Sequence, residues 1–82
     1  MAQYEVNSPL PGVFYRRAAP DAPSYAQEGD RVEPDTVIGL IEVMKQFSEL
    51  RAGYAGTLSS FSLADGEPLE PGQLVALIES DS

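Results

Sequence analysis

The 82-residue sequence contains no cysteine and no histidine, and it has a single lysine, Lys45. Without these residues, disulfides, thiol chemistry, Cys/His zinc sites and histidine-based catalytic triads are excluded. Basic residues are also scarce: five positive charges face thirteen acidic residues, which gives a formal net charge of −8. This acidity disfavours nucleic acid and anionic membrane surfaces as partners, and self-repulsion favours a monomer.

Long apolar runs are absent as well. No stretch reaches the ~18–20 apolar residues that a membrane helix needs. Residues 1–5 have neither the basic region nor the apolar region of a signal peptide. We therefore expect a cytoplasmic protein with no membrane span, in keeping with the lack of cysteine. The length predicts one small domain over residues 1–82.

The sequence does contain a regular series of turn signals. Clusters of Pro, Gly and Asp recur at short intervals, with runs of Val, Ile, Leu, Phe and Tyr between them. This spacing is typical of an all-β sandwich or barrel and leaves no room for a crossover helix. The predicted strands cover residues 4–7, 12–16, 37–43, 46–52, 56–63 and 74–79, with short extended pieces near 31–32 and 68–69.

The two halves of the chain resemble each other. With a shift of 37 residues, segment 29–34 aligns with 66–71, and the match continues from 37–42 onto 74–79. Turn residues fall on turn residues and apolar residues on apolar residues. This pattern indicates a duplicated β-unit.

A loop interrupts the first half. Residues 11–14 align with 55–58 only at a shift of 44, so the first half holds seven extra residues. They fall in a stretch rich in Ala and Pro at about 17–26, where proline cannot continue a strand ladder. We therefore expect a protruding loop there, with half-repeats over about 4–43 and 46–80.

Residues 37–52, where the halves meet, must fold back on themselves. Sixteen extended residues would span roughly 50 Å, whereas a domain of this size is only about 30 Å across. The apolar spacing alone would allow a helix, but the repeat with 74–79 favours strand, tight turn, strand, with Met44 and Lys45 at the tip. The tip lacks the Asn-Gly or Asp-Gly of most hairpins. A local rule broken at an exposed place marks a candidate functional site.

These residues resemble a known family. Residues 42–45, Glu-Val-Met-Lys, are similar to the E-A/V-M-K-M attachment motif of the biotin carboxyl carrier domain of biotin-dependent carboxylases. Residues 8–12 resemble the family's S-P-M-x-G segment, and residues 29–32 its G-D/Q-x-V turn. The resemblance extends from about residue 4 to residue 79.

The extra loop resembles the thumb of bacterial acetyl-CoA carboxylase carriers, an insertion that folds over biotin. The resemblance places Arg17, Pro20, Asp21 and Ala22 in this thumb. Arg17 stands where family thumbs carry a small hydroxyl residue, so the corresponding hydrogen bond to biotin does not carry over.

The resemblance implies a flattened β-barrel of two four-stranded antiparallel sheets with a pseudo-twofold repeat. It implies that a biotin protein ligase attaches biotin to Lys45. The biotin would then carry carboxyl groups from biotin carboxylase to a carboxyltransferase, as in an acetyl-CoA carboxylase of fatty-acid synthesis. The domain itself would be a non-catalytic carrier.

The residues around Lys45 have implied roles of their own. By family position Glu42 guides the ligase and Met44 adapts the motif to carriage. Val43 and Gln46 depart from the commonest Ala and Met. Alternatives are a lipoyl-type carrier, whose lysine usually lies in a D-K-A setting, and an unmodified biotinyl-like interaction module. A hydrolase using two carboxylates has only the abundance of Asp and Glu in its favour.

Overall fold

The structure, a computed structural model, describes residues 2–19 and 21–80. These residues form eight β-strands and no helix. The strands are β1 (Gln3–Asn7), β2 (Gly12–Tyr15), β3 (Arg31–Val32), β4 (Val37–Val43), β5 (Gln46–Arg51), β6 (Gly56–Phe61), β7 (Glu67–Leu69) and β8 (Leu74–Glu79). The predicted all-β fold is confirmed. In this part of the chain there is accordingly no helix that could cross a membrane.

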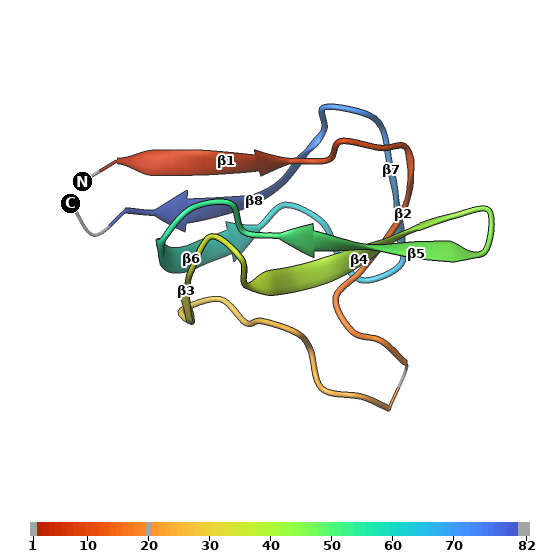
Figure 1. The fold of residues 1–82 in the computed structure, drawn as a ribbon, viewed down its shortest axis with the longest axis horizontal. Coiled ribbons are helices and arrows are strands. Elements are labelled where there is room, and N and C mark those ends of the chain that lie inside the picture. Colours follow the sequence, from red (N-terminus) through yellow and green to blue (C-terminus); the bar gives the residue numbers. More distant parts are fainter. Residues whose placement is uncertain (1, 20, 81–82) are drawn as a thin grey trace.

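The strands form two four-stranded antiparallel sheets, as predicted. One sheet has the order β1-β8-β6-β3 and the other the order β5-β4-β2-β7. The described part of the molecule measures 38 × 27 × 19 Å, so the barrel is flattened. The β4–β5 hairpin projects at one end of the long axis, and the start of β1 and the end of β8 lie at the other end (Figure 1).

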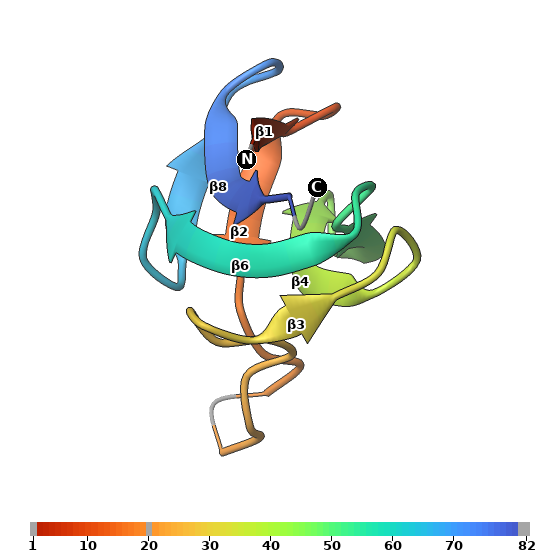
Figure 2. The ribbon, with the colours of Figure 1, turned by 90° about the vertical axis from the view of Figure 1, so that its left-hand side faces the viewer.

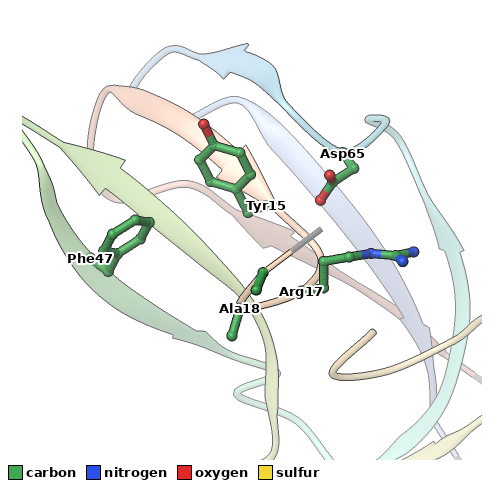
Figure 3. Close-up of a pocket in the computed structure, with 6 residues that line it drawn as sticks. Tyr15, Arg17, Ala18, Phe47 and Asp65 are labelled. Carbon is green, nitrogen blue, oxygen red and sulfur yellow. The ribbon is translucent and has the colours of Figure 1, made fainter. Parts of the chain in front are cut away.

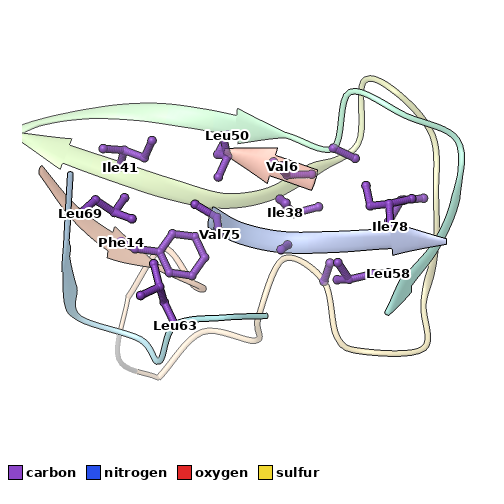
Figure 4. Close-up of a cluster of buried hydrophobic side chains, with 14 residues drawn as sticks. Val6, Phe14, Ile38, Ile41, Leu50, Leu58, Leu63, Leu69, Val75 and Ile78 are labelled. Carbon is purple, nitrogen blue, oxygen red and sulfur yellow. The ribbon is translucent and has the colours of Figure 1, made fainter. Parts of the chain in front are cut away.

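The core lies between the two sheets (Figure 4). Alternate residues of the strands point inward, because side chains on a strand alternate between its faces. Phe14, Ile38, Leu58, Val75 and Ile78 are completely buried. These side chains come from both halves of the chain, so neither half encloses a core alone.

Strand pairing follows the internal repeat. Val13 pairs with Glu42 in one sheet, and Thr57 pairs with Glu79 in the other. Val13 and Thr57 are related by the shift of 44, and the two glutamates by the shift of 37. The two shifts inferred from sequence therefore describe one register that occurs in both sheets.

Two turn glycines repeat their contacts in the same way. The Gly66 N–H donates to the Phe14 carbonyl at 2.7 Å, and the Gly29 N–H donates to the Leu58 carbonyl at 2.8 Å. Both glycines have positive φ, 85° and 98°, a region that favours glycine. Each half thus uses its glycine turn to attach to a strand of the other half.

The strand ends differ slightly from the predicted ones. β2 ends at Tyr15 rather than at residue 16, because the Arg16 N–H donates to the Asp65 carboxylate at 2.6 Å instead of to a strand. β5 ends one residue early, because the Ala52 N–H donates to the Thr36 carbonyl outside the ladder. β6 ends two residues early, at Phe61, and β1 and β7 each begin one residue earlier than predicted.

The connection from β2 to β3 is the long loop of the molecule. It projects away from both sheets (Figures 1 and 2). Arg17 and Ser24 form an isolated antiparallel bridge across it, and the Tyr25 N–H donates to the Arg16 carbonyl at 2.8 Å. Ala26, at the base of the loop, is buried in the core.

Candidate functional site

The β4–β5 hairpin turns within two residues. Val43 and Gln46 are its last paired residues, and Met44 and Lys45 have φ values of 52° and 66°. Positive φ at both central residues is the geometry of a type I′ turn, whose twist matches that of the flanking strands. Neither residue is glycine, so this geometry costs on the order of 1 kcal/mol or more per residue. The predicted strand, tight turn, strand is confirmed.

The turn presents its side chains to solvent. Met44 is 92% exposed, and Lys45 and Gln46 are exposed as well. Among the described residues, Lys45 has no ion-pair or hydrogen-bond partner. The only lysine of the chain therefore offers its primary amine at an accessible tip.

Glu42 lies on one face of the hairpin and contacts β2. It accepts a hydrogen bond of 3.3 Å from the Tyr15 hydroxyl. The Tyr15 ring lies 6.3 Å from the ring of Phe47, the residue paired with Glu42. Partial burial, followed by the negative charge and hydrogen bond of Glu42 and the charge of Asp65, raises the pKa of Tyr15 above 10.0.

A pocket of about 260 Å³ lies on this face, between the hairpin and the β2–β3 loop (Figure 3). Its walls combine two aromatic rings with one basic and one acidic side chain. The lining residues are Tyr15, Arg17, Ala18, Ala19, Phe47 and Asp65.

Arg17 is engaged within the loop itself. Its guanidinium donates to the Ala22 carbonyl at 3.4 Å and to the Ser24 hydroxyl at 3.2 Å. Asp21 is exposed, and Pro20 lies outside the described residues. Of the four residues assigned to the thumb from sequence, the structure therefore brings Arg17 and Ala22 together.

The other face of the hairpin borders a groove of about 430 Å³. Two of its residues, Met44 and Gln46, flank Lys45 in the chain. The groove is lined by Leu10, Pro11, Val43, Met44, Gln46 and Ser48. For clarity we call it the tip groove.

Four residues beside the turn were not singled out in the sequence: Tyr15, Phe47, Leu10 and Ser48. Exposed aromatic residues close to Lys45 were a usable signal for the first two. The shift of 44 gives a signal for the others, since it aligns Leu10 with Tyr54 and Ser48 with Tyr4.

The arrangement can hold a covalent group more readily than a metal. Among the described residues, no three His, Cys, Asp or Glu side chains gather as metal ligands. The exposed amine of Lys45 can instead form an amide with an activated carboxyl group.

Comparison with known proteins agrees with this chemistry. The profile of a family described as "Biotin-requiring enzyme" matches residues 4–78. The biotin carboxyl carrier protein of acetyl-CoA carboxylase from Chlamydia pneumoniae is 36% identical over 77 residues, which cover 94% of this chain and 46% of the relative. The carrier protein of the same name from Nostoc sp. is 35% identical over 77 residues, which cover 94% of this chain and 42% of the relative.

Solved structures contain the same fold. The crystal structure of Kluyveromyces lactis urea carboxylase matches with a TM-score of 0.79 and 26% identity, over 96% of this chain and 6% of that one. A single-chain long-chain acyl-CoA carboxylase matches with a TM-score of 0.77 at 18% identity, which shows the fold alone. The chain spans less than half the length of the two carrier proteins that it matches. By its sequence over nearly its whole length, the chain belongs to the family described as "Biotin-requiring enzyme".

Proposed function

We propose that this chain is a biotin carboxyl carrier domain in which biotin is joined as an amide to Nζ of Lys45. The observation that carries the proposal is the position of Lys45 at an exposed type I′ turn. The fold spends conformational energy to hold Met44 and Lys45 there without glycine. The family and the carrier-protein relatives support the choice of biotin.

The residues at the turn fit a biotinyl group. Lysine has a compact primary amine on a flexible stem, whereas the guanidinium of arginine does not serve for amide formation. Amide formation removes the lysine charge, so the formal net charge goes from −8 to −9. A ligase that supplies an activated biotin carboxyl needs only an accessible amine, and Lys45 is exposed.

The neighbours of Lys45 hold the attachment site in place. Val43 and Gln46 close the hairpin, and the Tyr15 hydroxyl holds the Glu42 carboxylate beside the strand. Met44 offers an exposed apolar contact next to the lysine. We assign Glu42 and Met44 to recognition by the ligase and the carboxylase subunits.

The domain positions its cargo and catalyses no step. Biotin, when bound, supplies a ring nitrogen that can carry a carboxyl group. The long axis of the molecule places Lys45 at the end opposite the start of β1 and the end of β8 (Figure 1). A neighbouring segment joined at those ends would leave the hairpin free to enter an active site.

The partners follow from the carrier role. They are a biotin protein ligase, a biotin carboxylase and a carboxyltransferase, and the names of the relatives favour an acetyl-CoA carboxylase. We propose that the domain acts as a monomer in the cytoplasm, where these enzymes would meet it.

Intact-mass analysis tests the proposal. Protein co-expressed with a biotin ligase and biotin should gain one biotinyl group. Lys45→Arg, which keeps the positive charge and the length of the side chain, should abolish the adduct completely. An adduct that survives this substitution, or no adduct on the wild type, contradicts the proposal. Co-expression with a lipoate ligase is the matched control, and a lipoyl adduct there would favour the lipoyl alternative.

A further inference from the structure

The tip groove has no described counterpart at the other end of the molecule. We propose that it is the resting seat of the biotinyl ring on Lys45 when no partner enzyme holds that ring. This inference rests on the proposed biotinylation and adds a location for the ring. The argument compares the two ends of the molecule, which the repeat makes equivalent.

The equivalence is fixed by strand register. Tyr4 pairs with Ile78 in one sheet, and Ser48 pairs with Ile41 in the other. The shift of 44 relates Tyr4 to Ser48, and the shift of 37 relates the two isoleucines. Both strand pairs also carry an irregularity at the corresponding place, after Val6 in β1 and before Gly39 in β4. Ser48 therefore occupies the backbone position that Tyr4 occupies at the other end.

The neighbouring loops correspond in the same way. The Ser8 N–H donates to the Gln73 carbonyl at 2.8 Å, and the Ala52 N–H donates to the Thr36 carbonyl at 2.9 Å. These residues are again related by the shifts of 44 and 37. The loop after Asn7 thus repeats the loop after Arg51, and its residue Leu10 corresponds to Tyr54.

At the end without the lysine, these positions hold two tyrosines. The rings of Tyr4 and Tyr54 stack 4.3 Å apart with an interplanar angle of 3°. Two stacked rings fill this end of the barrel with aromatic surface.

At the lysine end, the corresponding residues are Ser48 and Leu10. They are too small to fill the same space, and both line the tip groove. Leu10 remains 38% exposed. The groove thus results from two side-chain differences on a repeated backbone.

The chemistry of the tip groove suits a biotinyl ring. Leu10, Pro11 and Val43 supply apolar surface for the thioether ring. Gln46 and Ser48 supply an amide and a hydroxyl, which can pair with ureido N–H and C=O groups. Buried polar groups of a ligand need such partners, so this mixture favours a small polar heterocycle over a purely apolar occupant.

The pocket between the hairpin and the loop is the competing seat. Its volume of about 260 Å³ is smaller than the 430 Å³ of the tip groove and lies below the ~300 Å³ at which ligand clefts generally begin. The guanidinium of its polar residue Arg17 already donates to Ala22 and Ser24. The tip groove, in contrast, is lined by both chain neighbours of Lys45.

NMR of the apo and biotinylated wild type tests the seat directly. Residues 43–46 will shift from attachment alone, so the diagnostic amides are those of Leu10 and Ser48. We expect both to shift on biotinylation, with contacts between ring protons and the Leu10 methyl groups. Shifts at Ala18, Ala19 and Phe47 instead, or no shift beyond the turn, would overturn the inference. The mass of the sample reports biotinylation separately, so a failure of the proposed function is distinguishable.

A variant that fills the groove provides a second test. Ser48→Tyr restores the residue found at the other end and should abolish the Leu10 contacts while one biotinyl group is still attached. Ser59→Tyr, at an exposed serine of β6, is the matched control and should leave these contacts intact. Persistence of the Leu10 contacts in Ser48→Tyr contradicts the seat. If that variant does not fold, the wild-type comparison alone decides the question.

Discussion

The end of the molecule that carries the lysine and the end that carries Tyr4 have the same backbone and different surfaces. At one end two tyrosines stack 4.3 Å apart. At the other end Leu10 and Ser48 leave a groove beside the hairpin. The ladders match residue for residue, so the difference lies in side chains and in one loop. A duplicated fold can therefore gain a functional end without any change in its strand register.

The cores of the two halves differ in a compensating way. Phe14 in the first half corresponds to Leu58 in the second, and Gly39 corresponds to Ala76. A Cβ on Gly39 would lie 2.5 Å from Cε1 of Phe14, so the larger ring occupies the space that the glycine leaves. The second half has a smaller side chain opposite a methyl group. Both pairs fill the barrel at native density.

The largest predicted effect tests this exchange of volume. Gly39→Ala should lower the free energy of unfolding by about 2 kcal/mol, because the new methyl group overpacks against Phe14. Phe14→Leu alone should cost about 1 kcal/mol or more through lost buried volume. The double variant, which copies the second half, should lose less than the sum by at least about 0.5 kcal/mol. Urea unfolding measures all three.

A matched pair of variants in the second half provides the control. Leu58→Phe with Ala76→Gly builds the pair of the first half in the other sheet, and the two changes should again be less harmful together than apart. Additive effects in both halves would contradict the idea that the pairs exchange volume.

An intermediate effect is expected from shortening the long loop. The second half connects β6 to β7 through residues 62–66 alone, so removal of residues 18–24 should leave a cooperatively folded domain. Shortening a surface loop changes the closure entropy by less than about 1 kcal/mol, and Lys45 should still be biotinylated. Loss of cooperative unfolding would show that the loop is part of the core structure. Arg17→Ala, which removes the side-chain bonds to Ala22 and Ser24 at unchanged length, is the control.

The smallest effect concerns alkaline pH. Partial burial and the Glu42 charge raise the pKa of Tyr15 above 10.0, so folding favours the neutral hydroxyl. The resulting contribution to stability is complete below pH 10.0 and is lost as the pH rises through the raised pKa. Tyr15→Phe should remove this part of the alkaline decline. Ultraviolet titration should show a lower Tyr15 pKa in Glu42→Gln.

The control for this prediction is Tyr4→Phe, at the other end of the molecule, which should leave the Tyr15 titration unchanged. An unchanged Tyr15 pKa in Glu42→Gln would contradict the assigned cause. The second half has Ser59 at the position of Tyr15, so this pH dependence belongs to the lysine-bearing half alone.

Local sequence reasoning predicted the strands and the turn, because their signals are local. Proline and glycine clusters bound the strands, and the repeat decided against a helix in residues 37–52. The strand ends were less predictable, since β2 ends where a distant carboxylate, Asp65, takes the Arg16 N–H. The hydrogen bond from Tyr15 to Glu42 joins residues 27 positions apart, and no local pattern signals it.

The sequence by itself determined the all-β architecture, the duplicated register and the single lysine at the turn between the halves. These properties depend on side-chain alternation, turn chemistry and residue counts, which the chain carries in order. Only the tertiary structure decided that the turn has positive φ at Met44 and Lys45, and that hollows flank it on two faces. Those features arise where β2, β5 and two loops meet, and packing between distant segments depends on how their volumes fit together in space.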